Sequence, residues 1–444
     1  MRDDSTIYAP ATAPGRSGLA VIRLAGPAAG DSLQQLTGQP LPAPRKIVRR
    51  SINHPVTGEV LDQGMIAWFP APGSFTGEDG AELYLHGGRA VLAAVLGALG
   101  KLPNLKLAEP GEFTRRAFLN GRLDLTEVEG LADLVAAETE AQRRQAVRQL
   151  DGVLGQLYGG WSESLTSALA RLEAAIDFPD EDLPAHLIVS VTEQVAPVAE
   201  AMAQHLADGH RGERLREGLS VAIMGPPNAG KSSLFNALAK REAAIVSPHE
   251  GTTRDVLEVS LDLGGYPVLL ADTAGLRRTR NEIEAEGVRR AERRAADADL
   301  RIFVLDAERI TEQLPNLLNL RRDRDLVLAN KMDLLGTRPL PQPGVPLLPI
   351  SVHSGYGLND LVARIGEIAA QSMDSIGSPA LTRARHRSAL EDALVSLTRS
   401  REARDPELMA EDLRLAVRAI GRITGRVDVE DLLDRIFSEF CIGK

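Results

Sequence analysis

One segment of the chain restricts the possible folds more than any other. The residues from Gly225 to Ser232 read GPPNAGKS and match the pattern G-x-x-x-x-G-K-[ST]. They follow the apolar run from Leu219 to Met224, which predicts a buried strand, and they precede a segment with a helical pattern. Glycines at these positions allow backbone N–H groups to surround phosphates. We therefore expect a phosphate-binding loop at the start of a parallel α/β domain.

The side chains of this loop predict how a nucleotide is held. Lys231 can bridge the β- and γ-phosphates, and the hydroxyl of Ser232 can coordinate Mg²⁺. Asn228 has two interpretations: its oxygen is a ligand for a monovalent cation beside the phosphates, or it is a turn residue of the loop. The expected nucleotide contacts in this segment are Asn228, Ala229, Gly230, Lys231, Ser232 and Ser233.

A second motif and a loop are expected to contact the γ-phosphate and Mg²⁺ of a bound nucleotide. The motif Asp272, Thr273, Ala274 and Gly275 follows an apolar strand pattern. Its aspartate can hold Mg²⁺ through water, and the N–H of Gly275 can sense a γ-phosphate. Residues 251–255 lie between the two motifs, where a switch loop is expected, and Thr253 is the expected second Mg²⁺ ligand.

A third motif predicts which base is bound. Asn330, Lys331, Met332 and Asp333 follow another strand pattern. The carboxylate of Asp333 can accept hydrogen bonds from N1–H and the 2-amino group of guanine, and adenine has neither donor. An unpaired buried carboxylate costs about 1–3 kcal/mol or more, so adenine is rejected. The expected loop behind the base is formed by Ser351, Val352 and His353. Together the motifs resemble those of translation-factor-like GTPases and indicate a GTPase, not an ATPase.

The position that orients the attacking water in Ras-type enzymes holds Leu276, and leucine cannot orient water. Either turnover is very slow or another group acts. Glu284 is either that group or an exposed acid at the start of a helix. The sequence has no obvious arginine finger, although Arg254 and Arg277 stay open as alternatives.

The pattern along the chain predicts a multidomain α/β protein. We expect an α+β domain at 1–120, helical segments at 121–212 and 374–444, and the Ras-like GTPase domain at 213–373. The helical segments either pack on one another, with the GTPase domain inserted, or form two separate domains. The first arrangement is favoured because the short C-terminal segment would have a marginal core alone. Residues 211–214 are expected to be a linker.

Composition excludes several classes of protein. The 51 basic and 61 acidic residues give a net charge of −10, which argues against a generally basic nucleic-acid coat. The single cysteine excludes an internal disulfide and a multi-cysteine zinc site. No apolar run reaches the roughly 20 residues that span a bilayer, and the first residues do not resemble a secretory signal. We expect a cytoplasmic protein without a membrane partner.

The whole chain resembles one family, the tRNA uridine-modification GTPases known as MnmE or TrmE. Besides the GTPase motifs, the strings that carry the resemblance are residues 11–18, 21–23, 74–79, 82, 86–88, 110–120, 123–125 and 440–444. The resemblance implies a homodimer joined through the N-terminal domains. It also implies an FAD-dependent partner of the MnmG or GidA type, in a heterotetramer or larger assembly, and tRNA as substrate.

In the N-terminal domain the resemblance implies a site for 5-formyl-tetrahydrofolate or 5,10-methylene-tetrahydrofolate. The matching residues are Arg23, Glu82, Arg122 and Lys444. Arginine and glutamate suit the edge of a pterin, which mixes donors and acceptors. Arg122 stands where the family has lysine, which keeps the charge but changes the geometry. Cys441 is either a thiol in the one-carbon chemistry or a small residue at a helix end.

In the GTPase domain the resemblance favours the cation interpretation of Asn228. The K⁺ ligands that it implies are Asn228, Ser247, His249 and Thr252, of which Ser247 and Thr252 also contact GTP. K⁺ would order the loop and join two GTPase domains face to face. The catalytic residues are then Glu284, which orients the water indirectly, Asn228 and Lys231.

The implied function is GTP-dependent modification of the wobble uridine of certain tRNAs at carbon 5. A folate carbon and the partner's flavin would install a carboxymethylaminomethyl or aminomethyl group. Two alternatives stay open: a ribosome-assembly GTPase, and a folate-dependent methyl or aminomethyl transferase whose GTPase is only regulatory.

Overall fold

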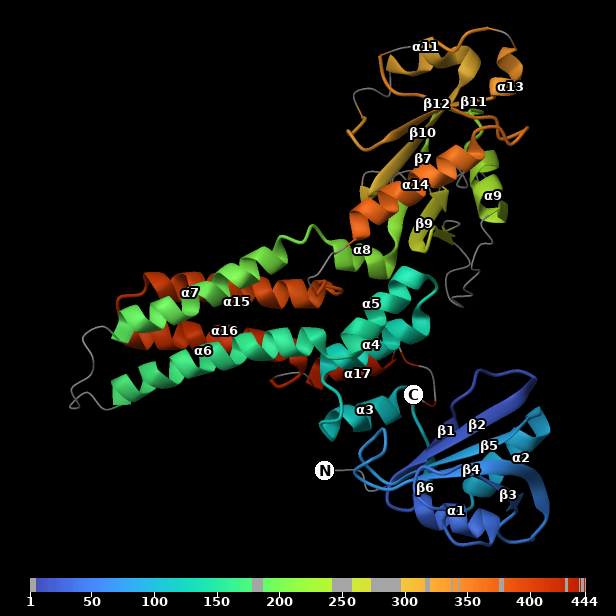
Figure 1. Cartoon of the computed structure of the whole chain (residues 1–444), viewed down its shortest axis with the longest axis vertical. Helices are drawn as coiled ribbons and strands as arrows, with labels where there is room; N and C mark the ends of the chain where they lie inside the picture. Colours follow the sequence, from blue (N-terminus) through green and yellow to red (C-terminus); the bar gives the residue numbers. More distant parts are fainter. Residues whose placement is uncertain are drawn as a thin grey trace, which may run out of the picture. The chain divides into compact units, whose positions relative to one another are not determined.

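The computed structural model describes most of the chain: residues 5–177, 187–241, 258–272, 297–315, 320–336, 338–341, 344–374, 379–427, 430–438, 440 and 443. The chain divides into two compact units, each with its own sheet (Figure 1). The first unit consists of residues 1–132, 149–163 and 418–444, and the second of residues 133–148 and 164–417.

The first unit contains a six-stranded sheet in the order β3-β4-β5-β2-β1-β6. Neighbouring strands are antiparallel except β1 and β6. The strands are β1 (Thr6–Pro10), β2 (Ser17–Ala25), β3 (Val48–Asn53), β4 (Val60–Phe69), β5 (Gly80–Gly87) and β6 (Leu105–Leu107). In β2, Ile22 and Leu24 are buried in the core with α1 (Ala29–Thr37) and α2 (Arg89–Leu99). Arg23 lies between them on the opposite face, because side chains alternate along a strand.

Helices α3 (Glu112–Leu119), α4 (Leu125–Ala136) and α17 (Glu430–Ser438) meet beside this sheet. Leu125 and Val128 of α4 share an apolar cluster with Phe437 of α17. Gly111, which precedes α3, has φ of +70° and lies against Phe437. A Cβ at Gly111 would lie 2.5 Å from the carbonyl oxygen of Phe437, so only glycine permits this approach. The C-terminal helix is therefore held closely on α3.

The second unit contains a six-stranded sheet in the order β12-β11-β10-β7-β9-β8. All its neighbours are parallel except β8 and β9. The strands are β7 (Leu219–Met224), β8 (Glu258–Leu263), β9 (Tyr266–Asp272), β10 (Leu300–Asp306), β11 (Leu326–Asn330) and β12 (Leu348–Pro349). Helices α9 (Lys231–Arg241), η1 (Ala307–Arg309), α11 (Ile310–Gln313), α13 (Met332–Leu335) and α14 (Leu358–Met373) belong to the same domain. The predicted parallel α/β domain is confirmed.

The interpretation of residues 211–214 as a linker is wrong, because they begin helix α8 (Arg211–Glu217). The guanidinium of Arg214 donates from Nε to Oδ1 of Asp299 at 2.6 Å. The other oxygen of that carboxylate accepts the N–H of Ser220 at 3.2 Å. Gly212 lies so close to the backbone of Leu381 that no Cβ fits between them. Tertiary contacts thus fix a helix that is too short to be stable alone.

The other helices are α5 (Glu140–Leu150), α6 (Val153–Asp177), α7 (Leu187–Leu206), α15 (Ala384–Glu402) and α16 (Pro406–Thr424). Helices α7 and α15 lie side by side (Figure 1). Arg387 of α15 donates to the carbonyl oxygen of Leu206 at 2.9 Å and to Oδ1 of Asp208 at 2.8 Å. Because α7 precedes the α/β domain and α15 follows it, the α/β domain is inserted between helices that pack on one another. Within the described ranges, no helix is long and apolar enough to cross a membrane.

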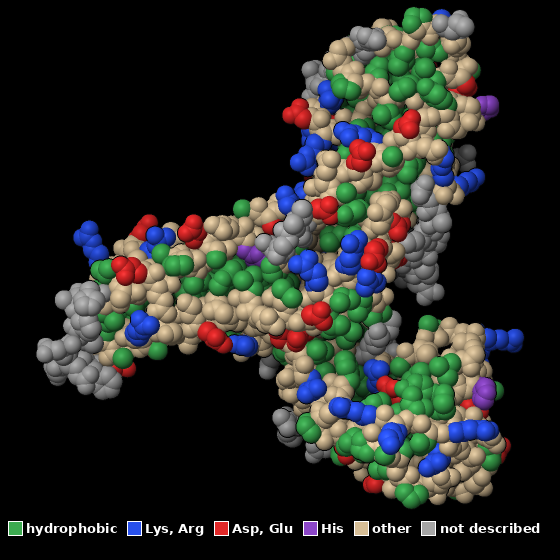
Figure 2. Space-filling view, in the orientation of Figure 1, with side chains coloured by type: hydrophobic (Ala, Val, Ile, Leu, Met, Phe, Trp, Pro, Cys, Tyr) green, Lys and Arg blue, Asp and Glu red, His purple; other side chains and the backbone are tan. Residues whose placement is uncertain are grey.

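Charged side chains of both signs lie on the face of the molecule drawn in Figure 2. On the face shown in Figure 2, Lys and Arg side chains lie among Asp and Glu side chains and do not gather into one continuous basic patch.

Candidate functional site

The phosphate-binding loop connects β7 to α9, and two of its glycines are required by geometry. Gly225 has φ of +144° and Gly230 has φ of +101°. A Cβ at Gly225 would collide with the backbone carbonyl of Val304, and one at Gly230 would collide with the side-chain amide of Asn330. The backbone of the loop therefore packs directly on β10 and on the end of β11.

The structure describes the side chains of the loop that were predicted to contact phosphate or a cation. Lys231 lies across the loop and donates from Nζ to the carbonyl oxygen of Pro226 at 2.9 Å. Ser232 and Ser233 are exposed in the first turn of α9, so the hydroxyl of Ser232 is accessible to Mg²⁺. Asn228 is exposed, with φ of +60°. Asparagine tolerates this conformation, so both interpretations of Asn228 fit the geometry.

Asn330 links the phosphate-binding loop to the loop behind the base. It ends β11 and is only 2% exposed. Its Nδ2 donates to the carbonyl oxygen of Ala229 at 2.8 Å, and its Oδ1 accepts the N–H of Val352 at 3.2 Å. Three segments that are distant in sequence are thus joined through one side chain.

The predicted base-binding residues lie together at the end of β11. Lys331 pairs with Asp306, with Nζ 2.8 Å from Oδ2. The hydroxyl of Ser351 donates to Oδ1 of Asp333 at 2.5 Å, and this hydrogen bond lowers the pKa of Asp333. His353 is exposed, and its Nδ1 lies 3.9 Å from the other oxygen of Asp333. An ionised, partly exposed carboxylate is the acceptor that the N1–H and 2-amino group of guanine require.

The predicted switch region falls outside the described residues. Its members are Ser247, His249, Thr252, Thr253, Arg254, Thr273, Ala274, Gly275, Leu276, Arg277 and Glu284, together with the side chain of Asp272. The backbone of Asp272 ends β9 opposite Ile223 of β7, next to the strand that leads into the phosphate-binding loop. The roles assigned to this region stay predictions.

In the first unit, Arg23 and Glu82 face each other across β2 and β5. Nε of Arg23 lies 3.1 Å from Oε1 of Glu82, and the hydroxyl of Tyr84 donates to Oε2 at 2.5 Å. Burial and this hydrogen bond raise the pKa of Tyr84 to about 12, so the phenol stays protonated. The guanidinium lies 5.5 Å from the ring centroid of Phe75 and 5.9 Å from that of Phe113. The cluster offers charged donors and acceptors next to an aromatic ring.

Arg122 packs on the loop at 74–79, which also contacts Arg23. Its Cγ lies 3.2 Å from the position that a Cβ of Gly77 would take, and Phe75 of this loop contacts Arg23. Lys444 and Cys441 fall outside the described residues. Gly443, between them, lies against the carbonyl oxygen of Pro10, which pairs with Ile22 beside Arg23.

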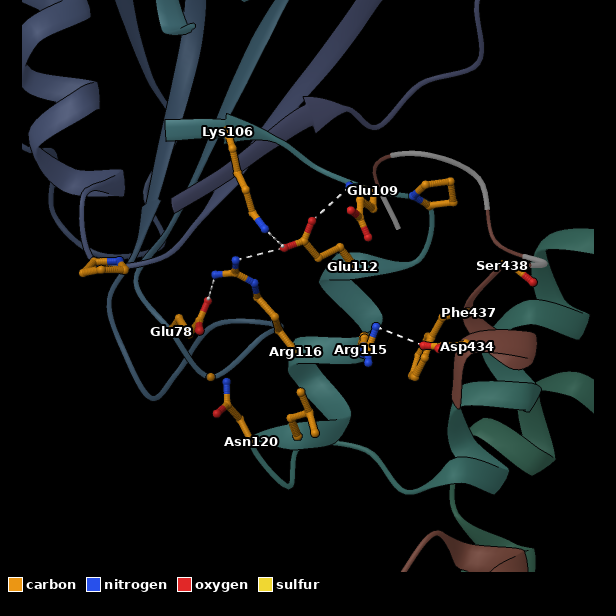
Figure 3. Close-up of a pocket in the computed structure, with 14 residues that line it drawn as sticks. Glu78, Lys106, Glu109, Glu112, Arg115, Arg116, Asn120, Asp434, Phe437 and Ser438 are labelled. Carbon is orange, nitrogen blue, oxygen red and sulfur yellow. Dashed lines mark hydrogen bonds and ion pairs between the residues drawn. The ribbon is translucent and has the colours of Figure 1, made fainter. Parts of the chain in front are cut away.

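A cavity of about 1130 Å³ is lined in part by Gly77 and Glu78 of this loop (Figure 3). The sequence interpretation gave it no role, because its walls come from distant segments. The only local signal was the string at 110–116, which marks the family without indicating a ligand. The lining residues are Pro27, Gly77, Glu78, Lys106, Glu109, Pro110, Glu112, Arg115, Arg116, Leu119, Asn120, Asp434, Phe437 and Ser438.

Comparison with known proteins gives matches along the whole chain. Residues 6–122 match the family described as "GTP-binding protein TrmE N-terminus", and residues 125–441 match "MnmE helical domain". The chain is 56% identical over 452 residues to the tRNA modification GTPase MnmE of Rhodospirillum rubrum, with 99% of each chain covered. It is 57% identical over 443 residues to the protein of that name from Parvibaculum lavamentivorans, covering 99% of this chain and 100% of the relative. It is also 48% identical over 469 residues to the mitochondrial 5-taurinomethyluridine-[tRNA] synthase subunit GTPB3 of Danio rerio, covering 99% of this chain and 93% of the relative.

Proposed function

The chain belongs to the MnmE/TrmE family of tRNA modification GTPases and is a GTPase, and from this premise we propose that it modifies the wobble uridine of certain tRNAs at carbon 5. The product carries a carboxymethylaminomethyl or aminomethyl group. The name of the Danio rerio relative supports carbon 5, since it specifies a methyl-linked substituent at that position of uridine. An FAD-dependent protein of the MnmG or GidA type shares the reaction, in a heterotetramer or larger assembly. We place the reaction in the cytoplasm, where its tRNA substrate is found.

The observation that carries this proposal is the Arg23–Glu82 cluster. It occurs in the same chain as the predicted guanine-nucleotide site around Asp333. The carboxylate of Glu82 can accept hydrogen bonds from the amino and N–H groups of a pterin edge. The guanidinium of Arg23 can donate to the pterin oxygen and ring nitrogens, next to the ring of Phe75. The donor set therefore fits 5-formyl- or 5,10-methylene-tetrahydrofolate, which would supply the one-carbon unit, with Arg122 and Lys444 as further contacts.

In the GTPase domain, Asp333 selects guanine, and the loop with Lys231 binds the phosphates. Mg²⁺ is held by Ser232 and Thr253, and by Asp272 through water. The K⁺ ligands are Asn228, Ser247, His249 and Thr252. K⁺ would supply positive charge where other GTPases use an arginine finger, and Glu284 orients the water. Closure of two GTPase domains within a homodimer, joined through residues 1–120, completes each site. The helical segments 121–212 and 374–444 support the GTPase domain 213–373.

The test is nucleoside analysis of tRNA from a deletion strain that expresses either the wild-type chain or Glu82→Gln. The wild-type chain should restore the modified wobble uridine, and Glu82→Gln should not. Normal tRNA in the deletion strain, with accumulation of immature ribosomal subunits, would instead support a ribosome-assembly GTPase. Modification by the purified chain without the flavoprotein would support a folate-dependent transferase.

A further inference from the structure

One wall of the cavity of about 1130 Å³ in the first unit consists of side chains that hydrogen-bond to one another and to the backbone (Figure 3). Arg116, whose side chain is 8% exposed, donates to the carbonyl oxygen of Ser5 at 2.8 Å. It also donates to Oε2 of Glu78 at 3.1 Å and to Oε1 of Glu112 at 3.0 Å. The second oxygen of Glu112 accepts the N–H of Glu109 at 2.9 Å. This network holds the wall together.

The rim of the cavity carries cations that are less firmly held. Arg115 is 43% exposed, and its Nη1 lies 3.3 Å from Oδ1 of Asp434, which is 77% exposed. Lys106 is 42% exposed and adds a second positive charge beside Glu112. An exposed ion pair contributes little to stability, so a ligand carboxylate can replace Asp434 at Arg115. The rim can thus bind an anion at Arg115 and Lys106, in competition with the carboxylates of Asp434 and Glu112, to which these cations are paired. Glu78 and Glu109 also line the cavity and oppose an anion.

The cavity also has apolar lining residues. Leu119, at the end of α3, is 60% exposed. Phe437 of α17 and Pro110 line the same space. Apolar surface beside exposed cations suits a ligand that has an aromatic or aliphatic part and carboxylates.

The loop at 74–79 connects this cavity to the predicted folate residues. Phe75 of this loop contacts Arg23, and Gly77 and Glu78 of the same loop line the cavity. The stem of Arg122 packs on Gly77 at the boundary. The predicted pterin contact Arg23 and the cavity are therefore neighbours of the same short loop.

We propose that this cavity binds the p-aminobenzoyl-glutamate part of the folate, with the glutamate carboxylates at Arg115 and Lys106. The inference rests on the proposed function and specifies its substrate class: folates with several γ-linked glutamates. Each added glutamate brings another carboxylate to the rim, so the affinity rises with tail length.

The test is equilibrium binding of 5-formyl-tetrahydrofolate with one or three glutamates to the full-length protein. The three-glutamate form should bind roughly 3- to 10-fold more tightly to the wild type, and this gain should shrink as salt is added. Arg115→Ala should abolish most of the gain, and Arg115→Lys should retain much of it. Asp434→Asn should increase the gain, because it removes a competing carboxylate. The matched control is Arg49→Ala on β3, an exposed arginine away from the cavity, which should leave the gain unchanged.

The outcomes test the role of the cavity and the proposed function separately. If the wild type binds both forms equally, or if Arg115→Ala keeps the full gain, the cavity does not bind the tail, while folate binding still supports the proposed function. If the wild type binds neither form, the proposed function itself is contradicted.

Discussion

The side chain of Asn330 donates a hydrogen bond to the carbonyl oxygen of Ala229 at 2.8 Å, and both residues are almost fully buried. A residue of the predicted base-recognition motif thus stabilises the predicted phosphate-binding loop. The two halves of the nucleotide site are coupled before any nucleotide binds, because the same side chain also accepts the N–H of Val352.

Replacing Asn330 with alanine should therefore weaken binding of GTP and GDP by similar factors. Buried partners left unpaired cost about 1–3 kcal/mol, which corresponds to roughly 5- to 150-fold in affinity. Fluorescent GTP and GDP analogues measure this directly. Asn359→Ala, at an exposed position on α14, is the matched control. Loss of GTP affinity alone would show that Asn330 acts on the γ-phosphate side and not on the loop as a whole.

Base specificity should depend on Asp333. Asp333→Asn replaces an acceptor with a donor, so GTP binding should weaken by at least about tenfold while binding of xanthosine triphosphate improves. Because the hydrogen bond from Ser351 lowers the pKa of Asp333, the carboxylate stays ionised in neutral solution. Between about pH 6 and 8 the ionisation state of Asp333 should therefore not change, and it should contribute no pH dependence to the affinity of the wild type for GTP. A variant that binds xanthosine and guanosine triphosphates as the wild type does would exclude Asp333 from base recognition.

The two interpretations of Asn228 can be separated with Asn228→Gly. Glycine adopts the observed φ of +60° without strain but has no side-chain oxygen. If Asn228 is a K⁺ ligand, the variant should keep its affinity for GDP and lose most of the stimulation of GTP hydrolysis by K⁺ over Na⁺. The measurement is the hydrolysis rate in each salt at matched ionic strength. Full K⁺ stimulation in this variant would assign the asparagine to the turn alone.

The parts of the fold predicted from sequence are those encoded by contiguous motifs. The phosphate-binding loop is flanked by a strand and a helix in the sequence itself, so its place in a parallel sheet follows from local patterns. The pair Arg115–Asp434 and the helix fixed by Arg214 and Asp299 depend on residues far apart in the chain. Sequence periodicity does not reveal such pairs. The sequence pattern therefore predicts neither the cavity nor the helix that begins at residue 211. The roles of Arg23 and Glu82 came from the family resemblance, since an ion pair across two strands is by itself unremarkable.

Glu82→Gln should separate folate binding from GTP hydrolysis. The change removes the negative charge opposite Arg23 and the acceptor of the Tyr84 hydroxyl, while keeping the size of the side chain. We expect affinity for 5-formyl-tetrahydrofolate to fall by roughly tenfold or more, as for the loss of a charge-assisted hydrogen bond. The basal rate of GTP hydrolysis should not change. Unaltered folate binding would remove this pair from the site.

Stability should fall on mild acidification because of His205, near the end of α7. Burial lowers its pKa; Asp208 opposes this effect, and His386 and Arg387 reinforce it. The folded state then binds fewer protons than the unfolded state below about pH 6.5, so protonation favours unfolding as the pH falls. The protection of α7 amides from hydrogen exchange, corrected for the pH dependence of exchange in an unfolded chain, should fall as the pH is lowered from about 7 to 5.5. His205→Gln should flatten this dependence, whereas His353→Gln, at an exposed position, should not. An equal pH dependence in wild type and His205→Gln would assign the acid sensitivity to other groups.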